Sequence, residues 1–521
     1  MNASTWIGND ADRQTLGERS VMSSKRRALK GFRARRVCFW KGFPPLALLA
    51  FAVLLAGCGT RATGVSAPVV SEAQDAQLEV ESMRRAGTVT LEATEGNASP
   101  DVGLAQEATL EGILKLTVKQ NPRVQAARHR WQAATNKRAQ AVSLPDPMLE
   151  FKYFMRSVET RTGPQKWSLG LSQRIPYPGK LIIAGKIADK QTQAAYLRYE
   201  ATLRDQIAAA KAAFFELYYI DRAERVTDEV RKLYDRYAGL AAGGTATGKP
   251  KLPETFRAES QRAQLGYDLV LLREMRTAEE EGLRAIAGAG HELNLGPTQE
   301  IAEPVPLATS LEDLHAVAQQ HNQELGAAGI EIERAEFQSK LARRAPIPDL
   351  TIGANYIKTG DPIPALRNTP DASKDPIALG VGVSIPLWFP KYTAMAREAR
   401  EMEHAARSEQ RHTGLQLRAD LAKAYFKLNN SSRLVQLYRE TLIPQSRQAL
   451  QSAEELHRTG EANLAALLET TATVHNFELA RLRATADFYQ NVARIERLLG
   501  TALDLQPEPA AHGPPKEREQ P

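Results

Sequence analysis

The stretch GGTATGKP at residues 243–250 comes closest to a motif that could do chemistry. A phosphate-binding P-loop reads G-x-x-x-x-G-K followed by Ser or Thr, whose hydroxyl binds the magnesium ion that accompanies the phosphates. Gly243, Gly248 and Lys249 fit this pattern, but Pro250 stands where the hydroxyl is required. A P-loop also follows a hydrophobic strand, whereas the preceding residues are charged and helical in period. The stretch therefore indicates a turn between two helices, with Pro250 in the first turn of the returning helix.

Other residue types that could carry catalysis or bind metal are scattered. The nine His include the pairs His404 with His412 and His315 with His321, whose spacings do not suit ligands on one helix, and no H-E-x-x-H is present. The eight Met form no paired soft-ligand clusters. We therefore expect no enzyme activity, no resident metal site and no cofactor beyond a covalent lipid.

The basic excess of the chain, a net charge of +7, is confined to its start. Residues 1–57 hold 10 of the 68 Lys and Arg but only 3 of the 61 Asp and Glu, which leaves 58 residues of each sign in the remainder. The body of the protein is neutral by this count. The charge therefore gives no support to a nucleic-acid partner.

The basic start has the pattern of a secretory signal peptide. Lys and Arg residues precede an apolar run from Leu46 to Ala56 that is too short to span a bilayer as a helix, and it ends in Leu-Ala-Gly-Cys at Cys58. This ending resembles the bacterial lipobox, which implies cleavage after residue 57 and lipid on Cys58. Gly59 is not the Asp that retains such lipoproteins at the inner membrane, so we expect the outer membrane. The polar residues 1–21 leave Met22 as a second candidate start.

The sequence from about residue 105 onward consists of two related copies. SLPDPMLEF at 143–151 parallels PIPDLTIGA at 346–354, LGLSQRIP at 169–176 parallels LGVGVSIP at 379–386, and AFFEL at 213–217 parallels AYFKL at 424–428. Gly248 pairs with Gly460, and Gly288 with Gly500. Anchors in one order at offsets of 203 to 212 indicate a tandem duplication.

Each copy contains two segments that alternate between apolar and polar residues, the signature of strands with two different faces. Each is about ten residues long, the length of a tilted transmembrane β-strand. Four strands cannot close a barrel by themselves, so the chain must oligomerise. The residues expected to face lipid are Phe151, Tyr153, Trp167, Leu169, Ile352, Tyr356, Leu379 and Val381.

Helical stretches are expected at about 105–142 and 310–343, before the strands, and much longer ones at about 181–240 and 392–459. Lengths of some 60 residues indicate a coiled coil or a helical array. Leu464, Leu468, Thr471, Val474, Leu482, Val492, Ile495 and Leu499 recur at helical spacing in the last helix. Pro444 removes one internal hydrogen bond and should kink its helix, whereas its counterpart Leu233 should not.

The order of helix, strand pair, long helix, turn and helix, given twice over residues 105–500, resembles the TolC-like outer-membrane efflux proteins. The run LPDPMLEF, followed by LSQRIPYPGKL, is similar to the branch with heavy-metal efflux components. The resemblance implies an α+β membrane protein: a trimeric 12-stranded β-barrel, four strands per chain, continued by a long α-helical coiled-coil periplasmic barrel. The expected segments are a signal peptide (1–57), a lipidated linker (58–104), a first repeat (105–290), an inter-repeat linker (291–309), a second repeat (310–500) and a disordered Pro- and Glu-rich tail (501–521).

The resemblance also implies sites and partners. The two turns at the periplasmic tip would contact a membrane-fusion adaptor, and the matching residues are Gly248, Lys249, Leu252, Thr459, Gly460 and Leu464. Glu469 matches a position where a ring of acidic residues constricts the tunnel, although an ordinary solvated Glu is an equal alternative. The implied function is passive conduction of drugs or heavy-metal cations from an inner-membrane pump, of RND type, to the outside.

Three other functions stay open at this point. The chain could be the outer component of a type I protein secretion system, which the neighbouring genes would decide. An ATPase would require nucleotide binding through Lys249. A periplasmic coiled-coil adaptor would have no lipid-facing strands.

Overall fold

The computed structural model describes residues 109–245, 252–291, 293–459, 461 and 463–503, without the side chains of 240–245 and 252. The predicted signal peptide, the lipidated linker with Cys58, and the tail beyond residue 503 lie outside these residues and stay predictions. Among the described helices, none combines the length and the apolar character needed to cross a bilayer.

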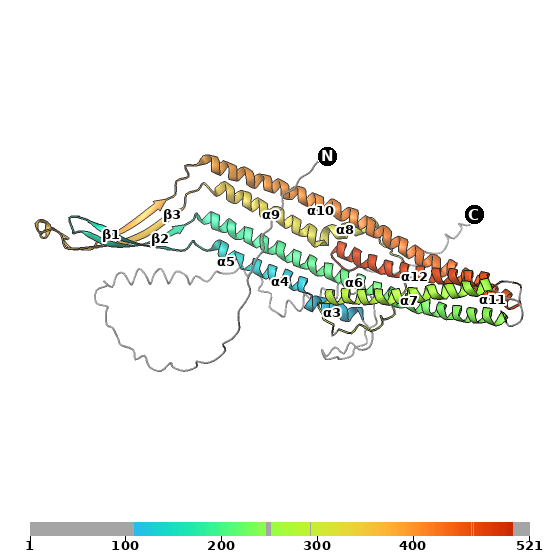
Figure 1. Cartoon of the computed structure of the whole chain (residues 1–521). Helices are drawn as coiled ribbons and strands as arrows, with labels where there is room; N and C mark the ends of the chain where they lie inside the picture. Colours follow the sequence, from blue (N-terminus) through green and yellow to red (C-terminus); the bar gives the residue numbers. More distant parts are fainter. Residues whose placement is uncertain (1–108, 246–251, 292, 460, 462, 504–521) are drawn as a thin grey trace, which may run out of the picture. The chain divides into compact units, whose positions relative to one another are not determined.

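The described chain is built from long helices and one small sheet (Figure 1). The first half contains the elements α3 (Leu110–Gln120), α4 (Pro122–Thr135), α5 (Lys137–Val142), β1 (Met148–Val158), β2 (Gln165–Ile175), α6 (Pro178–Thr245) and α7 (Leu252–Ala287). The second half contains α8 (Leu311–His321), α9 (Gln323–Arg344), β3 (Leu350–Thr359), η2 (Pro364–Leu366), β4 (Ile377–Val383), α10 (Phe389–Leu437), η3 (Tyr438–Leu442), α11 (Ile443–Thr459) and α12 (Leu464–Leu499). The predicted order of helices and strands is therefore observed in both halves.

The helical stretches before the strands are broken where continuous helices were expected, and an asparagine starts a new helix at the equivalent point in each. The Asn121 carboxamide oxygen accepts from the backbone N–H of Val124 at 3.1 Å, and that of Asn322 accepts from Leu325 at 2.8 Å. Each side chain also donates to the end of a distant helix, Asn121 to the Ile286 carbonyl at 2.7 Å and Asn322 to the Leu498 carbonyl at 2.9 Å. N-capping combined with a long-range bond favours the break over continuation.

The four strands form one antiparallel sheet in the order β1-β2-β3-β4. β1 and β4 are the edge strands, and within the described residues each pairs on one side only. Because β2 ends at Ile175 and α6 begins at Pro178, the sheet continues directly into the helices. The extended strands and the helix starts are visible at one end of Figure 1.

The long helices pack side by side, α6 against α7, α9 and α12, and α10 against α9 and α12. α6 runs unbroken for 68 residues. The second long stretch is interrupted by the π-helical turn η3, in which the Ile443 N–H donates to the Tyr438 carbonyl five residues back. This turn ends at Leu442, two residues before Pro444, which has no N–H for a normal helical bond. The kink expected at Pro444 stays a prediction.

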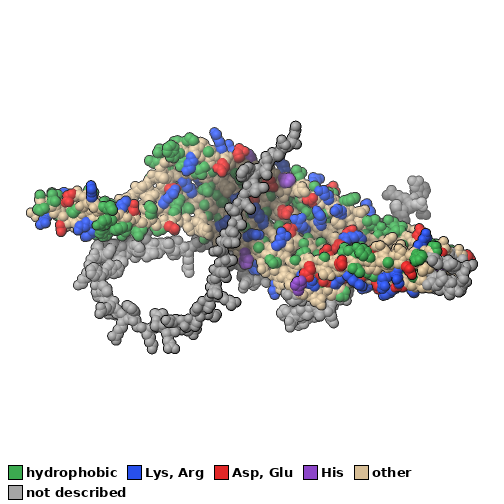
Figure 2. Space-filling model, in the orientation of Figure 1, with side chains coloured by type: hydrophobic (Ala, Val, Ile, Leu, Met, Phe, Trp, Pro, Cys, Tyr) green, Lys and Arg blue, Asp and Glu red, His purple; other side chains and the backbone are tan. Residues whose placement is uncertain are grey.

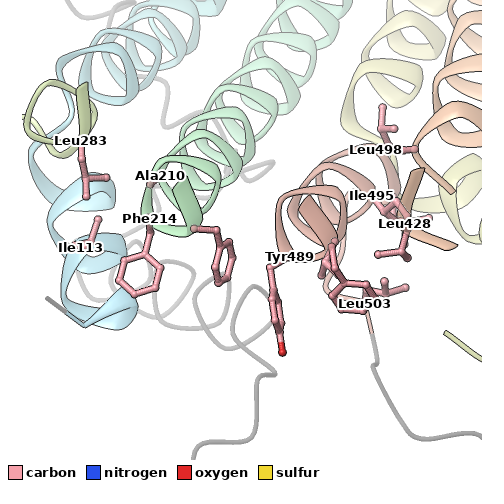
Figure 3. Close-up of a cluster of buried hydrophobic side chains, with 14 of the residues drawn as sticks. Ile113, Ala210, Phe214, Leu283, Leu428, Tyr489, Ile495, Leu498 and Leu503 are labelled. Atoms are coloured by element: carbon pink, nitrogen blue, oxygen red, sulfur yellow. The ribbon is translucent and has the colours of Figure 1, made fainter. Parts of the chain in front are cut away.

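The largest apolar core joins both halves of the chain. It contains Ile113 of α3, Phe214 of α6, Leu283 of α7, Leu428 of α10 and Ile495 of α12 (Figure 3), all 2% exposed or less. A second cluster lies nearer the ends of α6 and α11, around Tyr234 and Leu464. All eight residues predicted to form the apolar face of the last helix are buried, which is what antiparallel packing of amphipathic helices requires.

Candidate functional site

The sheet carries one apolar and one polar face. Phe151 pairs with Leu169, Leu169 with Tyr356, and Tyr356 with Ile377, so these four side chains form one row across all the strands. Since side chains alternate along a strand, the same register places all eight predicted residues on this face. The opposite face carries mostly small or polar residues, with Met148 and Ile357 as apolar exceptions: Glu150, Ser168, Gly170, Ser172, Thr351, Gly353, Asn355, Gly380 and Gly382.

The apolar face is uncovered in the single chain. Leu379 is 84% exposed, Val381 75%, Tyr153 69% and Phe151 63%, whereas Trp167 is half-buried between aromatic rings of the neighbouring strands. Figure 2 shows hydrophobic side chains gathered over the sheet and the start of α10. Burial of each large apolar side chain is worth about 1.5–3 kcal/mol. The face is therefore suited to an apolar surrounding.

The junction between strands and helices is held by a buried carboxylate that the sequence reasoning used only as a repeat anchor. Asp349, immediately before β3, is 7% exposed and accepts from Lys180 Nζ at 2.8 Å and Arg174 Nη2 at 2.5 Å. It also accepts from the Tyr177 backbone N–H at 3.3 Å. Burial by itself raises the pKa of this carboxyl, but the hydrogen bonds from Lys180 and Arg174 outweigh burial and leave the pKa below its ordinary value. Asp349 fastens β3 to the start of α6.

The predicted adaptor-contact residues are only partly within the described chain. Gly248, Lys249 and Gly460 lie outside it, and of Leu252 only the backbone, at the start of α7, is described. Thr459 ends α11, is exposed, and donates through its hydroxyl to the Leu456 carbonyl at 3.1 Å.

Leu464 starts α12 behind the N-cap Asn463 and is 1% exposed in the second core cluster. Its side chain therefore packs against the neighbouring helices of its own chain, which sequence spacing could not distinguish from an outward contact. Glu469, five residues later, is exposed, and its backbone carbonyl accepts from the Thr473 hydroxyl. The exposed position suits both a tunnel constriction and a solvated helix face, so its role stays a prediction.

A network of charges inside the helical region was missed by the sequence reasoning. Arg483 of α12 donates to both Glu216 carboxylate oxygens at 2.7 and 2.8 Å and to Asp487 at 2.6 Å. Burial raises the pKa of Glu216, but the hydrogen bonds from Arg483 and Gln490 more than offset it, so the pKa is lowered. The network borders a groove of about 690 Å³ between α6, α10 and α12, lined mainly by charged and amide side chains. Such a groove can hold water and ions but offers no apolar ligand pocket.

The described residues contain no group of three or more His, Cys, Asp and Glu that could hold a metal ion. The candidate site is therefore the apolar face of the sheet and the junction between strands and helices.

A four-stranded sheet with one apolar face, attached to long paired helices, defines the TolC-like outer-membrane channel fold. Residues 314–501 match the family described as Outer membrane efflux protein. Over these residues, which form most of the second half, the chain is similar to the members of this family.

Individual proteins are similar to the chain over most of its length. The cobalt-zinc-cadmium resistance protein CzcC of Cupriavidus metallidurans is 22% identical over 398 residues, which cover 75% of this chain and 90% of that protein. The crystal structure of VceC from Vibrio cholerae superposes with a TM-score of 0.63 at 18% identity, covering 77% of this chain and 98% of VceC. CusC, described as forming a transmembrane channel, gives a TM-score of 0.59 at 13% identity, covering 76% and 92% of the two chains.

Proposed function

We propose that this protein is the outer-membrane channel of a tripartite efflux system, passively conducting substrate from an inner-membrane pump and a periplasmic adaptor to the outside. The observation that carries the proposal is the sheet, which has one exposed apolar face, two edges that pair with no described strand, and a direct continuation into long helices. In a bilayer, an open sheet edge would leave backbone groups without partners. A sheet of this kind is therefore completed by other copies.

The proposed assembly is a homotrimer. Four strands from each of three chains give a barrel of twelve strands, above the minimum of about eight for a closed transmembrane barrel. The apolar row through Phe151, Leu169 and Tyr356 would face lipid, and the face with Ser168 and Gly353 would face the lumen. The long helices would continue the barrel into the periplasm, where the two turns dock an adaptor. Lipid on Cys58 would anchor the chain to the outer membrane.

The proposed duct arose by tandem duplication. Matching contacts in the two halves support this origin. Asn121 and Asn322 each cap a helix and donate to a carbonyl near the end of α7 or α12. Gly288 and Gly500, which follow α7 and α12, each lie against the backbone of the residue before that asparagine. Duplication of a unit with two strands would also explain how each chain contributes four strands to the barrel.

Divalent heavy-metal cations are the proposed substrate class, with drugs as the alternative. The support is the likeness to a cobalt-zinc-cadmium resistance protein over most of both chains. Passage through a polar duct requires no metal cage, so the absence of ligand clusters among the described residues is compatible with this class.

The test is reconstitution of the purified, lipidated protein in planar bilayers, together with deletion of its gene in the host. We expect heat-modifiable trimers, discrete conductance steps, and increased metal sensitivity that the wild-type gene restores. Failure to find trimers or conductance would contradict the channel. A loss of secreted protein without a change in metal or drug sensitivity would favour the type I secretion function instead.

Two substitutions examine the proposed details. Glu469→Ala should reduce cation selectivity, whereas Glu455→Ala, at an exposed Glu of α11 paired with Arg458, should not. Equal cation selectivity in both variants would show that Glu469 is an ordinary solvated residue and does not constrict the tunnel. Cys58→Ser should abolish incorporation of labelled fatty acid, and retained label would refute the lipid anchor.

A further inference from the structure

The two strand-to-helix junctions of the chain are equivalent in sequence but differ in their contacts. Asp349, in the Pro-Asp pair before β3, is buried and bonded to Lys180 at 2.8 Å. Asp146, in the Pro-Asp pair before β1, is exposed, and its carboxylate makes no ion pair with any described residue. The aspartate of the Pro-Asp motif is thus ion-paired before β3 but not before β1.

The counterpart of Lys180 stands at the opposite edge of the sheet. Lys180 is the third residue of α6, after β2, and Lys391 is the third residue of α10, after β4. Lys391 is exposed, and its ammonium group lies over the ring of its own neighbour Tyr392, 5.8 Å from the ring centre. Asp146 precedes β1 and Lys391 follows β4, so three strand spacings, about 14 Å, separate them within one chain. They can meet only between chains.

The helices next to the two junctions show a similar equivalence, but here the charges are opposite: α9 is acidic where α4 is basic, and α6 is basic where α10 is acidic. Within the chain, Glu331 of α9 pairs with Arg198 of α6 at 2.7 Å. Counted from the capping residues Asn121 and Asn322, the residue of α4 equivalent to Glu331 is Arg130, which is exposed. The residue of α10 equivalent to Arg198, 211 positions along, is Glu409, also exposed.

The charge reversal extends along both surfaces. Residues 122–142, which form α4 and α5, contain no Asp or Glu and expose Arg123, Arg130 and Lys137. The stripe of α10 in line with Lys391, at steps of three and four residues, exposes Met395, Glu398, Met402 and Glu409, while Arg397, Arg400 and Arg407 are exposed beside it. The two carboxylates of this stripe are complementary to the basic residues of α4 and α5.

We propose that α4–α5 and the β1 edge of one protomer bind α10 and the β4 edge of a second copy, through the ion pairs Asp146–Lys391 and Arg130–Glu409. This seam, defined by these four residues, rests on the proposed trimer and specifies its contacts. It reproduces between chains the contact that α9 and Asp349 make with α6 inside one chain. Inside one chain α4 and α5 already pack against α6, so the seam would place them between α6 of their own chain and α10 of the second copy.

The test is a charge swap read out on trimers extracted from the outer membrane. Asp146→Lys and Lys391→Asp each place like charges at every seam. Because a departing protomer breaks two seams, a loss of about five-fold at each should accelerate trimer dissociation by about 25-fold. The double variant should regain near wild-type persistence. Lys374→Asp is the control, since Lys374 is an exposed lysine of the β3–β4 connection, paired locally with Asp371, and should leave dissociation unchanged.

The second pair is tested by cross-linking Arg130→Cys together with Glu409→Cys through a short bis-maleimide. Covalent trimers support the seam, while Arg130→Cys with Glu455→Cys, which is on α11, should give none. If wild-type trimers form but the double charge swap fails to rescue and no cross-link forms, the seam is wrong and the channel stands. If the wild-type protein itself forms no trimer, the proposed channel and the seam both fail.

Discussion

Replacing Asp349 by Asn should destabilise the folded protomer by about 3 kcal/mol. The substitution keeps the size of the side chain but removes the charge that Lys180, only 17% exposed, and Arg174, 61% exposed, both face. Breaking a buried ion pair typically costs about 3–5 kcal/mol because one charge is left uncompensated. The low end applies, since Lys180 keeps its bond to the Ile347 carbonyl at 2.6 Å and Arg174 reaches solvent.

The effect of Asp349 should also depend on pH in a defined direction. Its folded pKa lies below the ordinary 3.8 because the bonds from Lys180 and Arg174 outweigh burial. The stabilisation is therefore fully present above the unfolded pKa and is lost as the pH falls through the folded pKa. Wild type and Asp349→Asn should differ by a constant amount at neutral pH and converge in strong acid.

The measurement is urea unfolding of detergent-solubilised protein followed by far-ultraviolet circular dichroism over a pH series. Asp189→Asn is the matched control, because Asp189 pairs with Arg138 at 3.2 Å with both side chains well exposed and should cost less than about 1 kcal/mol. If Asp349→Asn costs no more than this control, or if its cost persists unchanged in acid, the junction does not work as described.

Three further predictions concern the core and the helix ends, each checked by the same unfolding assay. Gly500→Ala should destabilise the folded protein by more than about 2 kcal/mol, because Gly500 has φ of +73° and a Cβ would meet the His321 carbonyl oxygen at 2.2 Å. Gly282→Ala is the control: Gly282 lies in open space on α7, and its substitution should stabilise the folded protein by about 0.5–1 kcal/mol. Phe488→Ala should cost about 3–5 kcal/mol, since this ring is fully buried, and a loss below about 1 kcal/mol would contradict its place in the core. Burial lowers the pKa of His475 below its ordinary 6.5, so the unfolded chain binds the proton first and stability should fall as the pH drops through 6.5; His475→Gln should flatten this dependence, and an unchanged slope would exclude this histidine as its cause.

Local patterns in the sequence determined the elements and their faces. Phe151, Leu169, Tyr356 and Leu379 could be assigned to one strand face because side-chain direction in a strand depends only on position parity. A P-loop at 243–250 could be excluded because Pro250 cannot supply the required hydroxyl; the turn predicted there lies largely outside the described residues. Pro444 lacks the N–H of a normal helical bond, but the π turn that precedes it was not predicted.

Only the tertiary structure decided which distant groups meet. The breaks at Asn121 and Asn322 depend on carbonyls 165 and 176 residues away, and Asp349 finds Lys180 across 169 residues. The burial of Leu464 depends on Tyr234 and its neighbours on other helices. Helix and strand periodicities fix which way a side chain points, but the partner it reaches is set by the packing of whole elements, which no local pattern encodes.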